Sequence, residues 1–289
     1  MWPVLAISFS TLMSPTAFAE ESLFGSGKIL ATPGVIQVEG AGGSGLSAWA
    51  MISGYGTNRQ IGGSAHHTFV TTNDFTLNAT GVTMGFYDRV ELSFTRQWFD
   101  TGSAGGRLGL GDGFNFNQDI VGAKVRLFGD AVYDQDTWMP QVSVGAQYKK
   151  ADKGAIVRAV GAQEDDDFDF YLAASKILLD KSLVLSGTAR LTRANQFGLL
   201  GFGGPNGDNR SLQFEGNVSY LIDNSLVAGL DYRTKPDNLA FAEEDDAYAL
   251  FLAWLPSKHV SVTAAYTDLG KIALQGRQQG LYLSLQVGF

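Results

Sequence analysis

The chain has 289 residues, of which 45% are hydrophobic, 36 are Gly and none is Cys, and its formal net charge is −8. This hydrophobic content excludes a disordered chain, the lack of Cys excludes a disulfide scaffold, and the acidic balance argues against a nucleic-acid partner. No run of about 20 apolar residues is present, which excludes a helical membrane protein.

Residues 1–19, MWPVLAISFSTLMSPTAFA, resemble a secretion signal. An apolar stretch from Val4 to Leu12 is followed by the small residues Ala17 and Ala19, at the −3 and −1 positions of a cleavage site. No Lys or Arg precedes the apolar stretch, which departs from the usual pattern, and a buried helix is the alternative. We expect cleavage after Ala19 and export of the remaining chain.

Residues 20–45 form a Gly-rich segment ahead of the first expected strand. Val35, Ile36 and Val38 within it favour some burial. We expect this segment either to fold into the periplasmic mouth of the protein as a plug or to remain a disordered leader.

From residue 46 onward, stretches of about ten residues alternate between apolar and polar side chains. The last stretch is the clearest, because Leu283, Leu285 and Val287 alternate with Ser284 and Gln286. A period of two indicates a β-strand with one apolar and one polar face, and about 9–11 residues is the length that a tilted strand needs to cross a bilayer. Short turns between longer Gly- and Asp-rich loops are typical of an outer-membrane barrel, with a secreted β-sandwich as the alternative.

We predict an all-β fold, a transmembrane antiparallel up-and-down β-barrel of twelve strands spanning residues 46–289, although ten or fourteen strands are also compatible. An even number places both ends in the periplasm, and closure removes every unpaired strand edge. Strands are expected near 46–56, 74–84, 90–100, 119–128, 139–149, 168–178, 183–192, 210–221, 226–235, 247–255, 259–267 and 280–289. Long loops are expected at 57–73, 101–118, 150–167, 193–209, 235–246 and 268–279. An aromatic girdle near the strand ends is expected from Trp98, Phe99, Tyr148, Tyr232, Trp254 and Tyr266.

The last strand resembles the C-terminal signal by which the barrel assembly machinery recognises outer-membrane proteins. The residues that carry this resemblance are Tyr282, Leu283, Leu285, Val287 and the terminal Phe289. An ordinary amphipathic strand that ends the chain is the alternative.

Several segments along the whole mature chain resemble a proteobacterial family described as domain of unknown function 3034. They are TPGVIQVEG (32–40), GYGT (54–57), GFYDRVELS (85–93), GDAVYDQDTW (129–138), RANQFGLLGFGG (193–204), KPDNLAFAEEDDA (235–247) and GLYLSLQVGF (280–289). The resemblance implies a barrel in the outer membrane of a Gram-negative cell, with outer-membrane lipid and lipopolysaccharide as partners. It implies no activity and no catalytic residue.

If the apolar faces contact lipid, the opposite faces line the lumen and carry charges of both signs. By parity this set contains Glu91, Lys124, Arg126, Lys149, Asp169, Arg190, Glu215, Asp231 and Arg233. We expect a narrow or partly plugged channel for passive passage of a small solute, because a charged constriction can sort solutes. The alternative is a closed structural or surface-interaction barrel in which these charges pair and fill the lumen. Glu91 and Arg126 are expected to be cross-strand partners.

The expected loops differ in chemistry. The acidic runs 164–167 and 243–246 favour a solvated rim, with weak divalent-cation binding near lipopolysaccharide as the alternative. The apolar run 193–204 is a candidate for folding inward as a constriction or for contacting an apolar solute.

An outer-membrane lipid hydrolase is a third possibility. His259 and Ser261 have the spacing of a His-x-Ser pair, but parity directs both into the lumen, away from lipid. His66 and His67 are expected in a loop, where two adjacent His make a poor metal site. We therefore expect no enzymatic activity, no metal and no cofactor.

Overall fold

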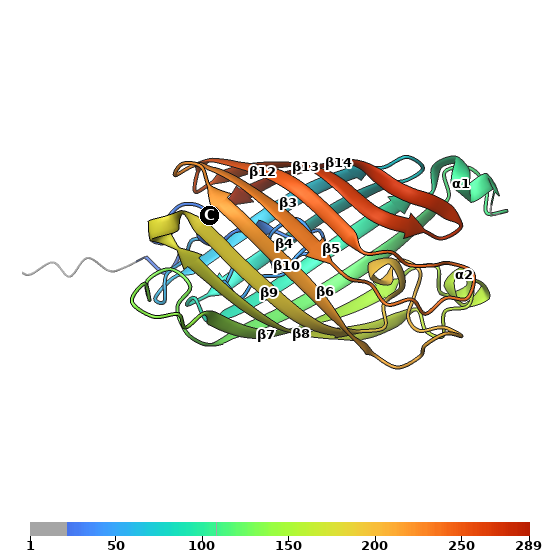
Figure 1. Cartoon of the computed structure of the whole chain (residues 1–289), viewed down its shortest axis with the longest axis horizontal. Coiled ribbons are helices and arrows are strands. Elements are labelled where there is room, and N and C mark those ends of the chain that lie inside the picture. The colour runs from blue at the N-terminus through green and yellow to red at the C-terminus, as the bar shows by residue number, and fades with distance from the viewer. Residues whose placement is uncertain (1–21, 108) are drawn as a thin grey trace, which may run out of the picture.

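The computed structural model describes residues 22–107 and 109–289, so the predicted signal with Ala17 and Ala19 lies outside the described residues. Twelve antiparallel strands form one closed barrel, in which each strand pairs with the next and β14 pairs with β3 (Figure 1). The strands are β3 (Ile61–Thr71), β4 (Thr76–Phe86), β5 (Val90–Asp100), β6 (Asn115–Phe128), β7 (Gln141–Ala151), β8 (Asp166–Leu178), β9 (Leu183–Thr192), β10 (Ser211–Leu221), β11 (Leu226–Arg233), β12 (Ala247–Ser257), β13 (Val260–Ile272) and β14 (Gln275–Gly288). No helix in these two described ranges is long and apolar enough to cross a membrane.

Side chains alternate between the outer surface and the interior along every barrel strand, as the sequence predicts. On β5, Phe94 is 45% exposed on the outside, whereas the next residue, Thr95, is fully buried. On β14, Leu283 and Leu285 face outward and Tyr282 faces inward. A wall one residue thick, with lipid outside, produces this pattern because each strand must present apolar side chains on one face only.

The barrel has two unlike ends (Figure 1). The terminal end holds the start of β3, the C-terminus and the short 3₁₀ helix η1 (Leu179–Lys181). The loop end holds the long connections 101–114, 152–165, 193–210 and 234–246. These connections contain α1 (Gly102–Arg107), α2 (Gly154–Ala159) and the 3₁₀ helix η2 (Asn195–Gly198).

Three details of the predicted strands and loops are wrong. The first barrel strand is Ile61–Thr71, not 46–56, because residues 46–56 lie inside the barrel and are buried on every side. Residues 57–73 and 268–279 are largely strand, and the connections there are the tight turns 72–75 and 273–274. His66 and His67 consequently lie on β3 and not in a loop.

One member of the predicted aromatic girdle faces the wrong way. Phe99 points into the barrel and packs on Phe75, with ring centroids 5.1 Å apart. Trp98, Trp254 and Tyr266 lie on the outer surface. The difference follows from strand parity, since Trp98 and Phe99 are adjacent and cannot both face lipid.

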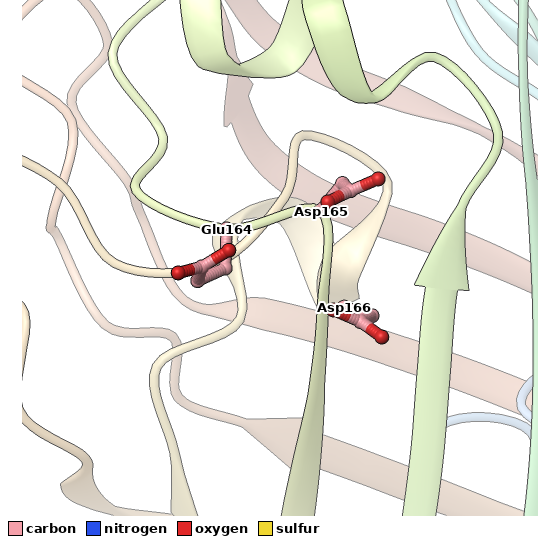
Figure 2. Close-up of side chains that lie close together, drawn as sticks. All are labelled: Glu164, Asp165 and Asp166. Carbon is pink, nitrogen blue, oxygen red and sulfur yellow. The ribbon is translucent and has the colours of Figure 1, made fainter.

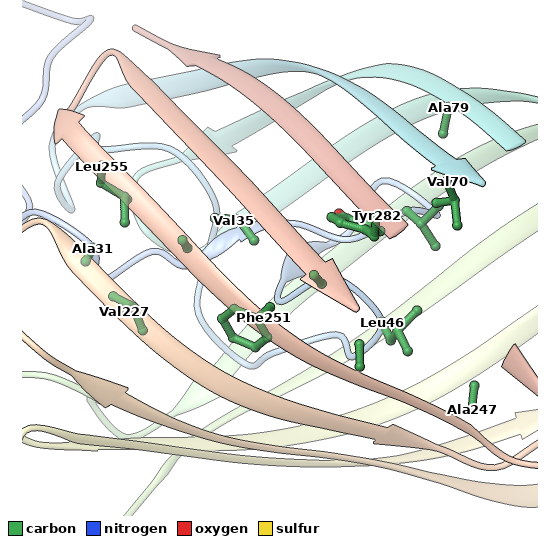
Figure 3. Close-up of a cluster of buried hydrophobic side chains, with 14 residues drawn as sticks. Ala31, Val35, Leu46, Val70, Ala79, Val227, Ala247, Phe251, Leu255 and Tyr282 are labelled. Carbon is green, nitrogen blue, oxygen red and sulfur yellow. The ribbon is translucent and has the colours of Figure 1, made fainter. Parts of the chain in front are cut away.

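Residues 22–60 are here called the plug. Its two ends, residues 22–30 and 57–60, are partly exposed at the terminal end, and residues 31–56 run inside the barrel. Two short strands, β1 (Val35–Ile36) and β2 (Gly42–Gly43), pair with each other within it. Figure 3 shows Val35 and Leu46 of the plug among inward-facing side chains of the wall, including Phe251 and Tyr282. Gly40 has a φ of +94° and its Cα lies against Thr95, where a Cβ would be 2.3 Å from the Thr95 hydroxyl. Glycine is therefore required there both by the backbone and by the close approach of the wall.

The C-terminal residue closes the barrel. Phe289 and Gly63 exchange two backbone hydrogen bonds, of 3.0 and 2.9 Å. The Phe289 ring also covers Gly63, at which an added Cβ would lie 2.4 Å from the ring. The end of the chain thus locks the seam between β14 and β3.

Candidate functional site: a plugged lumen

Side chains of the wall hydrogen-bond the backbone of the plug around the lumen. Gln97 donates to the Val38 carbonyl at 2.8 Å, and Thr83 donates to the Gly40 carbonyl at 3.1 Å. From other strands, Gln141 and Ser143 both donate to the Ala50 carbonyl, at 2.7 and 2.5 Å. An irregular segment can be buried only if its backbone polar groups find partners, and here the wall supplies them.

Glu39 of the plug is the centre of the charged network. Its carboxylate lies 2.5 Å from Lys149 Nζ and 2.7 Å from Arg233 Nη1, and all three side chains are buried. Lys149 also lies 2.7 Å from Asp169, and Arg233 lies 3.5 Å from Glu215. Glu39 therefore joins β7 and β11, on different parts of the wall, through one plug side chain.

A second ionic contact holds the turn of the plug around β2. Glu91 accepts hydrogen bonds from the backbone amides of Gly42 (2.9 Å) and Ser53 (2.8 Å). Lys124 lies 2.9 Å from Glu91 and donates to the carbonyls of Gly42 and Trp49, each at 3.1 Å. This ion pair is buried, and backbone groups of the plug supply the further hydrogen-bond partners that both charged side chains need.

The third contact lies on β9, β10 and β11. Glu215 accepts from the Ala48 amide at 2.7 Å and pairs with Arg190 at 2.5 Å. Asp231 accepts from the Ser44 hydroxyl at 2.6 Å and from the Leu46 amide at 3.1 Å. These charged side chains of the wall thus bind the plug, whereas in an empty barrel they would face water.

The structure brings eight of the nine predicted lumen residues into this buried network. They are Glu91, Lys124, Lys149, Asp169, Arg190, Glu215, Asp231 and Arg233. Arg126 lies apart, at the terminal end, where it pairs with Asp88 and, at 2.9 Å, with Asp130. The predicted pairing of Glu91 with Arg126 is wrong, because the strand register places Glu91 opposite Lys124.

Glu39 was missed by sequence reasoning. It has no place in the strand alternation, because the segment around it is irregular. A signal was nevertheless present, since Glu39 is the only charged residue between Lys28 and Arg59. A lone acid in a long uncharged segment next to a barrel with charged lumen positions points to an ionic partner inside the barrel.

Polar contacts fasten the plug at the terminal end. Lys28 lies 2.8 Å from Asp88 in the turn between β4 and β5, and it donates to the Ile52 carbonyl at 2.8 Å. Burial lowers the pKa of the Lys28 ammonium, and the neighbouring Asp88 opposes this effect. Lys258, after β12, donates to the Ser26 carbonyl at 2.6 Å. The start of the plug is therefore tied to two different turns.

At the loop end, the apolar run predicted as a constriction folds inward over the plug. The Phe197 carbonyl accepts a hydrogen bond from Lys149 at 3.2 Å, and the Phe197 ring lies 4.3 Å from the Arg233 guanidinium. Lys149 and Arg233 are also the two partners of Glu39. The same pair of cations therefore contacts both the plug and the η2 loop, residues 193–204.

The η2 loop is backed by a second buried ion pair. Lys235 lies 3.0 Å from Glu244, and the Gln196 side chain donates to Glu244 at 2.6 Å. Burial raises the pKa of the Glu244 carboxyl above its ordinary value, and Lys235 opposes this effect. The acidic run 243–246 is thus not wholly a solvated rim, because one of its members supports the loop.

The other acidic run gathers its carboxylates on the rim. Ligand atoms of Glu164, Asp165 and Asp166 lie within 4.8 Å of one another (Figure 2). Asp165 already pairs with Arg158, and Asp166 lies 3.9 Å from Lys150. These cations neutralise part of the charge that a divalent ion would need.

The histidines and the serine considered for catalysis or metal binding do not come together in one site. His259 lies in the turn after β12, with Nδ1 3.0 Å from the Gly288 carbonyl, and Ser261 is buried on the inner face of β13. His66 is buried inside the barrel, whereas the His67 ring, on the outer face, lies 2.8 Å from the Thr80 hydroxyl.

The fold is a closed, twelve-stranded transmembrane β-barrel whose lumen is occupied by the plug. The chain belongs to the family described as "Protein of unknown function (DUF3034)", whose model matches residues 32–286. A comparison with curated proteins found no match.

Solved structures similar to this one are outer-membrane barrels. The KdgM porin has a TM-score of 0.52 and 11% identity, and the match covers 78% of this chain and 99% of that chain. The NanC porin has a TM-score of 0.48 and 12% identity, with 78% and 98% covered. Outer membrane phospholipase A from Escherichia coli has a TM-score of 0.42 and 7% identity, with 78% and 92% covered. At these identities the likeness concerns the fold alone.

Proposed function

We propose that this protein is a gated channel of the outer membrane, in which displacement of the plug opens a path for passive passage of small solutes. The loop end faces the cell exterior in this proposal and the terminal end faces the periplasm, in keeping with the even strand number. The observation that carries the proposal is that charged side chains of the wall form hydrogen bonds and ion pairs with a segment that belongs to no barrel strand.

The buried charges of the lumen contact both the wall and the plug. Wall charges pair with one another, as Glu91 does with Lys124 and Arg190 with Glu215, but several of them also need the plug to satisfy their hydrogen bonds. Here Glu91, Glu215 and Asp231 each accept hydrogen bonds from plug amides, and Lys149 and Arg233 share Glu39. The plug contributes no strand to the closed barrel, and in the described part of the chain its backbone forms a β-bridge with the wall only at the start of β3, where Phe24 bridges Ile61. Removal of the plug would leave a polar, charged passage through an intact wall.

The test is solute flux into liposomes. Protein lacking residues 22–58 is compared with the complete chain by the rate at which liposomes swell in small neutral sugars. We expect rapid swelling with the deletion variant and slow swelling with the complete chain. Equal, negligible swelling by both proteins, each shown to be folded by its heat-modifiable migration in gels, would contradict the proposal.

A closed structural barrel is the second candidate. The full compensation of buried charge in the lumen favours it, because every ionic side chain named in the network has an opposite charge or a backbone partner. In that case, contacts of the loops with other molecules would carry the function, and the deletion variant would fail to conduct or to fold.

A further inference from the structure

An apolar cavity lies between the plug and the η2 loop, at the loop end of the lumen. Leu46 of the plug forms one side of it, Phe99 and Ile272 of the wall form another, and Phe197, Leu199 and Leu200 of the loop form its roof. Its volume is about 50 Å³. A cavity above roughly 10–15 Å³ has room for a water molecule, but an apolar lining does not hold one.

The chemistry of this cavity differs from that of the rest of the lumen. No Asp, Glu, Lys or Arg is among the described residues that line it. The charged network that binds the plug lies beside it, and the Phe197 ring separates the cavity from Arg233. A charged solute would lose its hydration in such a site without gaining a partner, whereas an apolar molecule would gain contact area.

Two side chains of the lining, Thr267 and Tyr282, each carry a hydroxyl without a hydrogen-bond partner among the described residues. Thr267 lies on the inner face of β13, is fully buried and lines the cavity. Its hydroxyl has no hydrogen-bond partner within residues 22–107 and 109–289. An orphaned buried hydroxyl is costly, so it points to a group that arrives with a ligand.

The roof of the cavity contains a strained turn. Gln196 and Phe197 have φ values of 45° and 61°, in the left-handed region that non-glycine residues rarely adopt. Two adjacent residues of this kind store strain that is released when the turn changes conformation. A ring of the size of phenol is larger than the present cavity, and turning Phe197 aside would enlarge it from the loop end.

We infer that this cavity is a binding site for a small, neutral, mainly apolar molecule that carries one hydrogen-bonding group, of the class of phenols and aromatic alcohols. Such a ligand places its ring among the leucine and phenylalanine side chains and its hydroxyl against Thr267. The inference deepens the proposed function, because it names the solute class that meets the plug first from the loop end. Binding is measured separately from passage, so either can fail alone.

The experiment measures binding of 4-fluorophenol to the complete chain in detergent micelles by fluorine NMR, with protein-free micelles as the blank. Fluorobenzene serves as the probe without a hydroxyl, and 4-fluorobenzoate as the charged probe. Thr267→Val removes the orphaned hydroxyl at nearly constant shape. Thr263→Val is the matched control, because Thr263 is buried on the same face of β13 and does not line the cavity.

We expect saturable binding of 4-fluorophenol, weakened about fivefold by Thr267→Val through loss of one hydrogen bond and unchanged by Thr263→Val. Fluorobenzene should bind both variants and the wild type equally, and 4-fluorobenzoate should bind at least about tenfold more weakly than 4-fluorophenol. Val70→Phe, which adds volume to an inward-facing residue of the lining, should abolish binding of both neutral probes. If Val70→Phe does not fold, Leu200→Phe takes its place.

Three results would overturn the inference. One is uptake of 4-fluorophenol no greater than in protein-free micelles. Another is an equal effect of Thr267→Val and Thr263→Val on the affinity, which would show that the Thr267 hydroxyl does not contact the ligand. The third is equal binding of the benzoate, which would contradict an uncharged cavity. Binding without liposome flux would contradict the proposed channel and support the binding site. Flux without binding would support the channel and contradict the binding site.

Discussion

Substitution of Glu39 by Gln removes the one plug charge that joins β7 to β11, and its effect can be worked out from the contacts. Removing one partner of a buried ion pair costs about 3–5 kcal/mol, because the other charge is left buried without its counter-ion. Lys149 keeps Asp169 at 2.7 Å, and Arg233 keeps Glu215 at 3.5 Å, so the lower end of this range applies. A loss of about 3 kcal/mol raises the population with a displaced plug about 100-fold.

The chain has no cysteine, so a single introduced thiol reports plug displacement cleanly. Ser47→Cys places that thiol on the plug, where residue 47 is 1% exposed. Labelling by a membrane-impermeant maleimide then proceeds only when the plug leaves the lumen, and its rate follows the displaced population when reclosure is fast. We expect Glu39→Gln to accelerate labelling of this thiol about 100-fold.

Two controls make the result decisive. Glu164→Gln removes an exposed rim carboxylate and should leave the labelling rate unchanged. A thiol at Ser257, which is exposed in the wild type, should react equally fast with and without Glu39. Equal labelling of Ser47→Cys in the presence and absence of Glu39→Gln would show that this ionic contact does not hold the plug.

Three further predictions concern the wall, the seam and the loop. Val218→Arg places a charge on the lipid face and should destabilise the barrel by about 2–4 kcal/mol in urea unfolding in lipid, whereas Ser225→Arg in a turn should not; equal effects would contradict the assigned face. Deleting Phe289 removes both hydrogen bonds to the start of β3 and should lower the amount of heat-modifiable barrel in the outer membrane, and unchanged assembly would argue against this. Because burial raises the pKa of Glu244, closure of the η2 loop should be most stable below about pH 4.5 and weaken as pH rises through the raised value. Protection of the Gln196 amide, which donates to Glu244, against hydrogen exchange should therefore fall as pH rises. In Glu244→Gln this pH dependence of the protection should disappear.

The wall was predictable because lipid imposes one simple rule on every strand. Alternation along residues 90–100 or 280–289 indicates which side chains face lipid, and pairing of each strand with the next then follows from short connections. The polar face of the same strands identifies the lumen side chains without any knowledge of their partners.

The plug was not predictable in detail, because a segment buried on all sides has no period. Residues 46–56 contain polar and apolar side chains that are equally buried, since wall side chains satisfy the backbone and polar groups alike. Their irregular pattern resembles that of a strand with weak alternation. The contact between Glu39 and Arg233 joins residues 194 positions apart, and no local pattern encodes such a partner.

The most direct test of the gated lumen is single-channel recording in planar bilayers of the complete chain and of the chain lacking residues 22–58, in the same lipid and salt. We predict a closed baseline for the complete chain, steady open steps for the deletion variant, and renewed block when a peptide of residues 22–58 is added on the side of the terminal end. Glu39→Gln in the complete chain should show brief openings of the same size. Absence of steps from a deletion variant that retains heat-modifiable migration would show that the plug does not gate a conducting lumen.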